Sequence, residues 1–329
     1  MAKKAILSVL FLFILISSFC SRPKEDILRV SIHNFTGYAP FELADKYNLY
    51  DHDKIHLIEL ASSTTAIRAM SNDIVDAAAL TLDEALRLVD RGIEITIVLV
   101  IDFSNGADMI IGKPYIHNML DLKNKKIGVE ISSLGSFALL RALEKYNIRI
   151  EEISVSNFEV HEQVNAYKSN NFDAVVTHDP FSTKILNMGG RKLFSSKEIP
   201  YEISDVLVIR TDYLKKNPKN SRHLVESWYR ALEYAEKNPE NAFDLYSKYL
   251  GLSLHETKES FKLFIIPDLH ENYKLLDSKN GSFHATVRKL ESFMVKQNLL
   301  SAPHSLENFL SEAYLPEINA SSTDTEKIR

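Results

Sequence analysis

Two hydroxyl clusters are the first features of the chain whose residue types and spacing could do chemistry. Ser63, Thr64 and Thr65 follow one β-branched run, and Ser132 and Ser133 follow another. Each cluster begins a stretch with apolar residues at helical spacing, so its hydroxyls would lie beside the free backbone N–H groups of a helix N-terminus. Such a position could bind an anion or a carbonyl oxygen. Ordinary helix N-capping is the alternative role for each hydroxyl.

Carboxylates and further polar side chains occupy the same topological position, directly after predicted strands. In open α/β sheets this is where ligands collect. If several carboxylates face one cleft, they repel a bare anion unless a basic side chain neutralises their charge. These segments contain no Arg. We therefore expect a neutral or amine-bearing solute, although helix N-termini also bind anions without a formal cation. The further candidates are Tyr38, Thr81, Asp102, Asn105, Asp108, Glu130, His178 and Asp179.

Tyr38 and His178 are the candidates that carry rings. Tyr38 could lay its ring on a solute and donate its hydroxyl, and His178 could be a hydrogen-bond partner near neutral pH. The alternatives are a packed core aromatic and a structural His at a strand end. His52 and His56 are four residues apart, but a turn separates them, so they do not share a helix face. We therefore expect no metal and no cofactor.

The elements that must position these residues alternate along the chain between β-branched runs and helical stretches. This alternation predicts the α/β class, with sheets built from crossover connections. After residue 212 helical patterns dominate. The predicted strands are 27–33, 54–60, 76–80, 93–101, 107–112, 126–130, 153–158, 173–177 and 205–210; the helices are 40–49, 62–70, 82–91, 132–146, 161–169, 180–187, 221–238, 239–250, 253–264 and 282–298.

Composition bounds the function further. A chain of 329 residues, 45% of them hydrophobic, is long enough for two domains with proper cores. The formal net charge of −5 argues against a nucleic-acid partner. A single Cys excludes a disulfide framework within one chain and a Cys-rich metal site.

The N-terminus has the pattern of an export signal that ends at the only Cys. A basic start precedes residues 5–16 (AILSVLFLFILI), which are too few to span a membrane but fit a signal peptide over residues 1–20. Cys20 stands at the expected cut, as in bacterial lipoproteins, where the Cys carries the lipid. Phe19 departs from the small residue usual before that Cys, so the alternative is an ordinary secreted protein with a free Cys.

Several motifs, in order, resemble the nitrate/sulfonate/taurine-type substrate-binding proteins of ABC importers, here in lipoprotein form. The resemblance covers residues 28–210. It rests on residues 35–38 (FTGY), 75–78 (VDAA), 81–84 (TLDE), 104–108 (SNGAD), 110–114 (IIGKP), 121–129 (DLKNKKIGV), 173–177 (DAVVT) and 179–181 (DPF).

This resemblance implies the type II periplasmic-binding-protein fold, in which two α/β lobes joined by crossing strands close on a solute. We place one lobe at 26–113 plus 207–318, the other at 114–206, and a disordered tail at 319–329. The implied partners are a small solute (nitrate, a sulfonate, taurine, a pyrimidine or an amine-bearing compound), an ABC permease and the membrane, through lipid on Cys20. We expect a monomer at the cell envelope and no catalysis.

Two alternatives remain open at this stage. The first is an enzyme like the thiamine-pyrimidine synthases, which resemble this group but carry a Cys-rich iron motif that this chain, with Cys20 alone, lacks. The second is a surface lipoprotein that has kept the fold to bind a partner.

Overall fold

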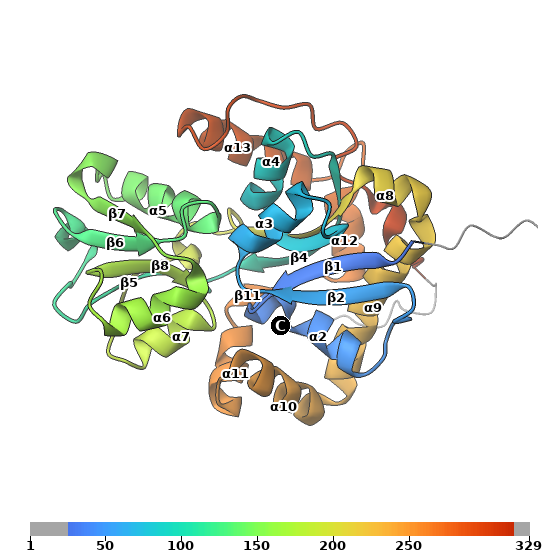
Figure 1. The fold of residues 1–329 in the computed structure, drawn as a ribbon, viewed down its shortest axis with the longest axis horizontal. Coiled ribbons are helices and arrows are strands. Elements are labelled where there is room, and N and C mark those ends of the chain that lie inside the picture. The colour runs from blue at the N-terminus through green and yellow to red at the C-terminus, as the bar shows by residue number, and fades with distance from the viewer. Residues whose placement is uncertain (1–25, 319–329) are drawn as a thin grey trace, which may run out of the picture.

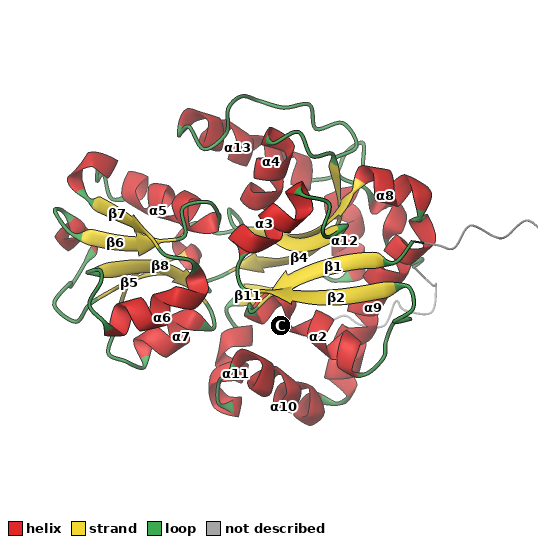
Figure 2. Ribbon diagram, in the orientation of Figure 1, coloured by secondary structure: helices red, strands yellow, loops and turns green. Residues whose placement is uncertain are grey.

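A computed structural model describes residues 26–318. The predicted signal peptide, with Cys20, and the predicted tail at 319–329 lie outside the described residues. Figure 1 shows two lobes side by side, and Figure 2 shows that each consists of a sheet covered by helices. None of the helices within residues 26–318 is long and apolar enough to cross a membrane.

The first lobe is built on a six-stranded sheet with the order β11-β4-β10-β3-β1-β2. Strands β1, β2 and β3 are parallel, and β10 runs antiparallel between β3 and β4. Every residue of β3 and β4 is buried, which explains their nearly continuous apolar sequences. The strands are β1 (Leu28–His33), β2 (Ile55–Leu60), β3 (Ala77–Thr81), β4 (Ile95–Ser104), β10 (Ser204–Arg210) and β11 (Phe264–Ile265).

The second lobe repeats this plan with five strands in the order β7-β6-β8-β5-β9. Strand β6 is parallel to β7 and β8, whereas β5 is antiparallel to β8 and β9. The strands are β5 (Asp108–Gly112), β6 (Lys126–Val129), β7 (Ser154–Asn157), β8 (Ala174–His178) and β9 (Arg191–Ser195).

The chain crosses between the sheets twice, from Ser104 to Asp108 and from Ser195 to Ser204. These crossings differ from the predicted boundaries at 113 and 207. The first crossing comes earlier because β5 pairs with β8 and β9 of the second sheet. The return also comes earlier, because β10 already pairs with β4 from Ser204 onward.

Helices cover both sheets and form most of the C-terminal third. Strand β9, strand β11 and helices α8 and α12 were absent from the predicted elements, and β11 begins where the predicted helix 253–264 ends. The helices are α2 (Ala39–Lys46), α3 (Ser63–Ser71), α4 (Leu82–Asp90), α5 (Leu134–Lys145), α6 (Val160–Lys168), α7 (Phe181–Leu186), α8 (Thr211–Lys216), α9 (Pro218–Lys237), α10 (Pro239–Leu250), α11 (Leu254–Phe261), α12 (Leu269–Leu276) and α13 (Phe283–Lys296).

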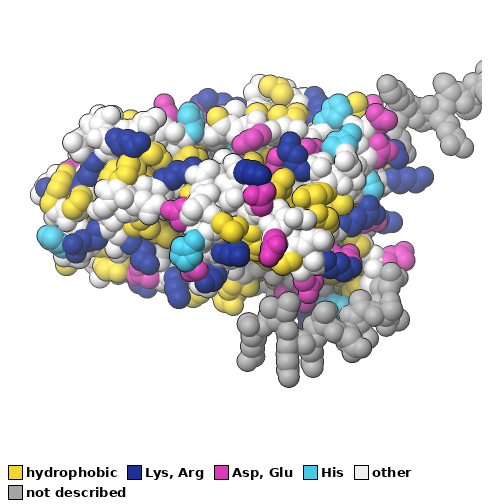
Figure 3. Space-filling model, turned by 90° about the horizontal axis from the view of Figure 1, so that it is seen from below, with side chains coloured by type: hydrophobic (Ala, Val, Ile, Leu, Met, Phe, Trp, Pro, Cys, Tyr) yellow, Lys and Arg dark blue, Asp and Glu magenta, His cyan; other side chains and the backbone are white. Residues whose placement is uncertain are grey.

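Packing of α9 on α2 anchors the first lobe. Trp228 of α9 is fully buried, and its ring centroid lies 4.8 Å from that of Phe41 in α2. On the outside, Lys and Arg are interspersed with Asp and Glu across the face in Figure 3. Pairs along one helix, such as Lys248 and Asp244 at 2.7 Å, account for part of this mixing.

Candidate functional site

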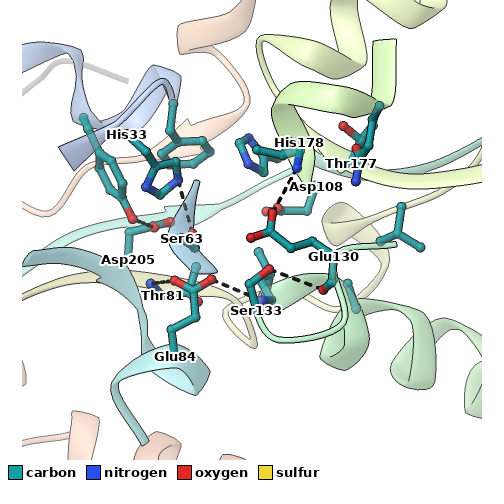
Figure 4. A pocket seen from close by; sticks show the side chains of 18 residues that line it. His33, Ser63, Thr81, Glu84, Asp108, Glu130, Ser133, Thr177, His178 and Asp205 are labelled. Carbon is teal, nitrogen blue, oxygen red and sulfur yellow. Dashed lines mark hydrogen bonds between the residues drawn. The ribbon is translucent and has the colours of Figure 1, made fainter. Parts of the chain in front are cut away.

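A small cavity lies between the lobes, at the carboxyl ends of strands and the starts of helices (Figure 4). Its volume of about 30 Å³ leaves room only for water, so this is a closed form of the protein. From the first lobe it is lined by His33, Phe35, Tyr38, Ser63, Thr81, Glu84 and Asp205; from the second by Asp108, Glu130, Ser133, Leu134, Gly135, Ala138, Val160, Gln163, Val176, Thr177 and His178.

Glu130 joins helix N-termini from both lobes. Its Oε1 accepts hydrogen bonds from the Thr64 backbone N–H (3.0 Å) and hydroxyl (2.5 Å) at the start of α3. Its Oε2 accepts one from the Val160 N–H (3.1 Å) at the start of α6. A carboxylate is favourable at both positions, because helix N-termini carry free donors and partial positive charge.

Glu84 makes the reciprocal contact from the first lobe. Its Oε2 accepts a hydrogen bond from the Thr81 N–H (3.0 Å) in its own lobe, and its Oε1 accepts one from the Leu134 N–H (3.1 Å) at the start of α5. Burial, together with the charge of Asp83 beside it, raises the pKa of Glu84 to about 8. Glu84 and Glu130 thus hold the lobes together with the protein's own carboxyl groups.

Two further carboxylates bond across the cleft outside the cavity. The Thr36 hydroxyl donates to Asp179 Oδ2 (2.9 Å), and the Ser62 hydroxyl donates to Glu159 Oε2 (2.6 Å). In each of these four contacts between the lobes the acceptor is a carboxyl group, and opening of the cleft would break them.

A second carboxyl cluster lies at the floor of the cleft. The Tyr38 hydroxyl donates to Asp205 Oδ1 (2.5 Å), and Asp205 is the cross-strand partner of Asp102. Burial raises the pKa of Asp102 to about 8 and that of Asp205 well above its usual range. Asp102 does not line the cavity, and its Oδ2 lies so close to Gly37 that a Cβ built there would come within 2.3 Å of it.

Five polar atoms of the lining have no hydrogen-bond partner among the described residues: His33 Nδ1, Asp108 Oδ2, Gln163 Oε1, Thr177 Oγ1 and Asp205 Oδ2. Each of these side chains is buried. The Gln163 amide donates through Nε2 to the Phe158 carbonyl (3.2 Å), which leaves its Oε1 as the free acceptor. Burial raises the pKa of Asp108 above its usual range.

Aromatic rings form another wall of the cavity. The Phe35 centroid lies 4.8 Å from that of Tyr38 and 5.1 Å from that of His178. Burial and the neighbouring His178 lower the pKa of His33 to about 3, so His33 is neutral. The Nδ1 of His178 lies 2.9 Å from the Asp179 carbonyl, which requires a proton on Nδ1 and leaves Nε2 as an acceptor in the neutral ring.

A family model for the NMT1-like family matches residues 21–247. The chain belongs to the NMT1-like family. One relative, a candidate binding protein of Brucella abortus (strain 2308), is 23% identical over 216 residues, which cover 63% of this chain and 65% of the relative. This NMT1-like protein therefore aligns with just under two thirds of that relative's length. The taurine-binding periplasmic protein of Escherichia coli (strain K12) is 21% identical over 219 residues, 65% of this chain and 68% of the relative.

Among solved structures, the periplasmic aliphatic sulphonate binding protein SsuA from Escherichia coli resembles this NMT1-like protein over 87% of this chain and 97% of its own. The TM-score is 0.70, at 18% sequence identity. This likeness confirms the predicted fold, two α/β lobes of the periplasmic-binding-protein type.

The NMT1-like protein brings seven of the thirteen predicted site residues to the cavity. The residues that line it are Tyr38, Ser63, Thr81, Asp108, Glu130, Ser133 and His178. Three others contribute to the contacts between the lobes: Thr64 with Glu130, Asp179 with Thr36, and Ser132, whose hydroxyl lies 2.7 Å from that of Thr64.

Three predicted residues do not line the cavity and do not bond across it. Thr65 lies one residue beyond the bridging Thr64, and its backbone N–H donates to the N-cap Ser62 (3.2 Å). Asp102 lies within β4 and faces Asp205. Asn105 belongs to the first crossing, where its N–H donates to the Leu263 carbonyl (2.8 Å).

Five polar lining residues were not among the predicted candidates: His33, Glu84, Gln163, Thr177 and Asp205. Each lies inside a strand or helix rather than in the polar segment after a strand. The position of Glu84, three residues after Thr81, is a capping-box signal, which points to local capping and not to a contact with the other lobe.

His52 and His56 are the two histidines that lie four residues apart in the sequence. The His52 ring is 3.0 Å from the Asn48 side-chain oxygen. Within residues 26–318, no group of three or more His, Cys, Asp or Glu side chains is placed to hold a metal ion.

Proposed function

We propose that this protein is a solute-binding receptor that captures a small molecule between its lobes and delivers it to an ABC importer. The observation that carries this proposal is the cavity itself, which lies between two lobes joined by two crossings and is lined by polar groups from both. Tyr38 and Ser63 contribute from one lobe, Ser133 and His178 from the other.

Capture would work through an equilibrium between an open and a closed form. The closed form leaves about 30 Å³ in the cavity, so a solute must enter while the lobes are apart. The lobes would close less far around a bound solute than they do here. A solute that contacts both lobes still favours closure, because only a closed arrangement offers both sets of contacts. The crossings at 104–108 and 195–204 are the segments about which the lobes would turn.

The proposal also covers where the protein works and with which partner. The names of the relatives, which include a periplasmic taurine-binding protein, support an exported protein that works with a permease. We place it at the cell envelope, attached by lipid on Cys20, as a monomer. We also propose that it is not an enzyme, since its relatives are named for binding and the single Cys cannot supply a Cys-rich iron motif.

A thermal-shift screen of the purified protein tests the receptor function. The panel holds nitrate, sulfonates, taurine, pyrimidines, amidines and polyamines. We expect one class to raise the melting temperature, and Ser133→Ala to reduce the shift because Ser133 lines the cavity. If no compound raises the melting temperature, the receptor function is contradicted.

A further inference from the structure

The ionisable side chains that line the cavity do not suit an anion. Its lining contains four carboxyl side chains, Glu84, Asp108, Glu130 and Asp205, and no Lys or Arg. The nearby Arg87 is engaged elsewhere: its guanidinium donates to the Ser136 hydroxyl (2.7 Å). A bound anion would therefore be desolvated among carboxyl groups without a counter-ion.

The helix N-termini that could replace a counter-ion are already occupied. The Thr64 and Val160 N–H groups donate to Glu130, and the Leu134 N–H donates to Glu84. These are the starts of α3, α6 and α5. A sulfonate or carboxylate that used these donors in the closed form would have to displace a buried carboxyl group of the protein.

On the second lobe's side, the cavity leaves two acceptors unsatisfied, and on the first lobe's side Asp205 Oδ2 and His33 Nδ1 also lack a partner among the described residues. Asp108 and Gln163 are 4% and 1% exposed, and Asp108 Oδ2 and Gln163 Oε1 both lack a partner among the described residues. Thr177 adds a free hydroxyl beside them in the lining. A buried acceptor without a donor is costly, so a solute that brings N–H donors gains the bonds that the protein alone does not make.

The aromatic rings of the cavity lining suit a flat charged group. Phe35 and Tyr38 lie edge to face, and His178 meets Phe35 at 87°. Aromatic faces attract cations, and the attraction grows when water is excluded. The aromatic faces and the exclusion of water from the cavity therefore favour a planar cation over a planar anion.

We propose that the solute is a small organic cation whose charged head carries N–H donors, such as an amidinium or guanidinium. Asp108 is its counter-ion, and Gln163 Oε1 is its second acceptor. This inference rests on the proposed receptor function and names its substrate class. It departs from the sulfonate-bearing solutes in the names of two similar proteins, an aliphatic sulphonate and taurine.

Isothermal titration with two matched series of compounds tests the proposal. Acetamidinium, acetamide and acetate have the same shape and differ in charge, as do benzamidinium, benzamide and benzoate, so the two series together also test the size of the solute. At equal ionic strength we expect one amidinium to bind at least about tenfold more tightly than its amide, and the carboxylates not to bind.

Asp108→Asn keeps the shape and removes the charge, and we expect it to weaken amidinium binding by about tenfold or more. Asp244→Asn is the matched control, because Asp244 is exposed on α10 and pairs with Lys248. If Asp108→Asn does not fold, Gln163→Met removes the second acceptor and should weaken binding several-fold.

The outcomes separate this inference from the function on which it rests. Binding of acetate, benzoate or taurine in place of an amidinium overturns the substrate class and leaves the receptor function standing. Equal amidinium affinity in wild type and Asp108→Asn overturns the role of Asp108. If none of these compounds binds and the broader screen also gives no shift, both proposals are overturned.

Discussion

Glu130 of the second lobe accepts a hydrogen bond from the backbone N–H of Thr64 in the first lobe, at 3.0 Å. The contact places a carboxylate of the protein where an anionic solute would bind in many proteins, at a helix N-terminus. It ties the closed form to a carboxyl side chain of the protein, and it leaves the free acceptors of the cavity to recognise the solute.

The first prediction concerns this contact. Glu130→Ala removes the acceptor that joins α3 to α6, and hydrogen bonds to charged groups contribute about 1.5–3 kcal/mol. The ratio of closed to open forms should fall about tenfold or more, and the radius of gyration from small-angle X-ray scattering should rise. Glu162→Ala is the control, because Glu162 bonds only the Glu159 N–H in its own lobe. Equal radii for both variants would show that Glu130 does not hold the lobes together.

The second prediction is a pH dependence through Glu84. Its pKa rises from 4.5 to about 8 through burial and the charges of Asp83 and Glu130, so the folded protein holds a proton that the unfolded chain has lost. The stability from this proton is fully present below pH 4.5 and is lost as the pH rises through about 8.

Melting temperatures measured from pH 5 to pH 9 check this loss of stability through Glu84. The wild type should lose more stability over that range than Glu84→Gln, which cannot ionise. Asp102 and Asp205, whose pKa values are also raised, contribute to the pH dependence in both proteins. Parallel profiles would contradict the assignment to Glu84.

The third prediction concerns the core of the first lobe. Trp228 is fully buried against Phe41, so Trp228→Ala should lower the free energy of unfolding by about 3–5 kcal/mol. Leu254→Ala on the exposed start of α11 should change it by less than about 0.5 kcal/mol. Denaturant unfolding measures both, and equal losses would mean that α9 does not anchor the lobe.

The fourth prediction concerns the N-terminus. In cells of the source organism grown with a radiolabelled fatty acid, the protein should take up label at Cys20, the only Cys of the chain. Cys20→Ala should abolish the label, and Ser21→Ala should keep it. An unlabelled wild type, or a labelled Cys20→Ala protein, would rule out lipidation at this residue.

The sequence predicted most of the fold because most strands carry long β-branched runs and most helices have caps and apolar stripes. It missed β9, an edge strand in which only Phe194 and Ser195 are buried, so that its pattern is polar. It also missed α12, although Asp268 and Glu271 form a capping box there, a signal that could have located the helix.

The site was predictable only in part, because the sequence places a residue after a strand but does not fix where its side chain points. Asp108 and His178 are cross-strand partners at strand ends, and both reach the cavity. Asp102 was assigned to a loop, yet β4 continues to Ser104, and Asp102 is buried within this strand and does not line the cavity. Glu84 and Gln163 lie on helices, and only the closed arrangement of the lobes brings them to the cavity.

Native mass spectrometry of the purified protein, with the solute identified by the screen, tests the central claim most directly. The account predicts one solute molecule bound to each chain, and no bound solute in a Ser133→Ala/Asp108→Asn double variant that folds as the wild type does. A folded wild type that retains no solute, or a double variant that retains as much as the wild type, would contradict a solute receptor with its site in this cavity.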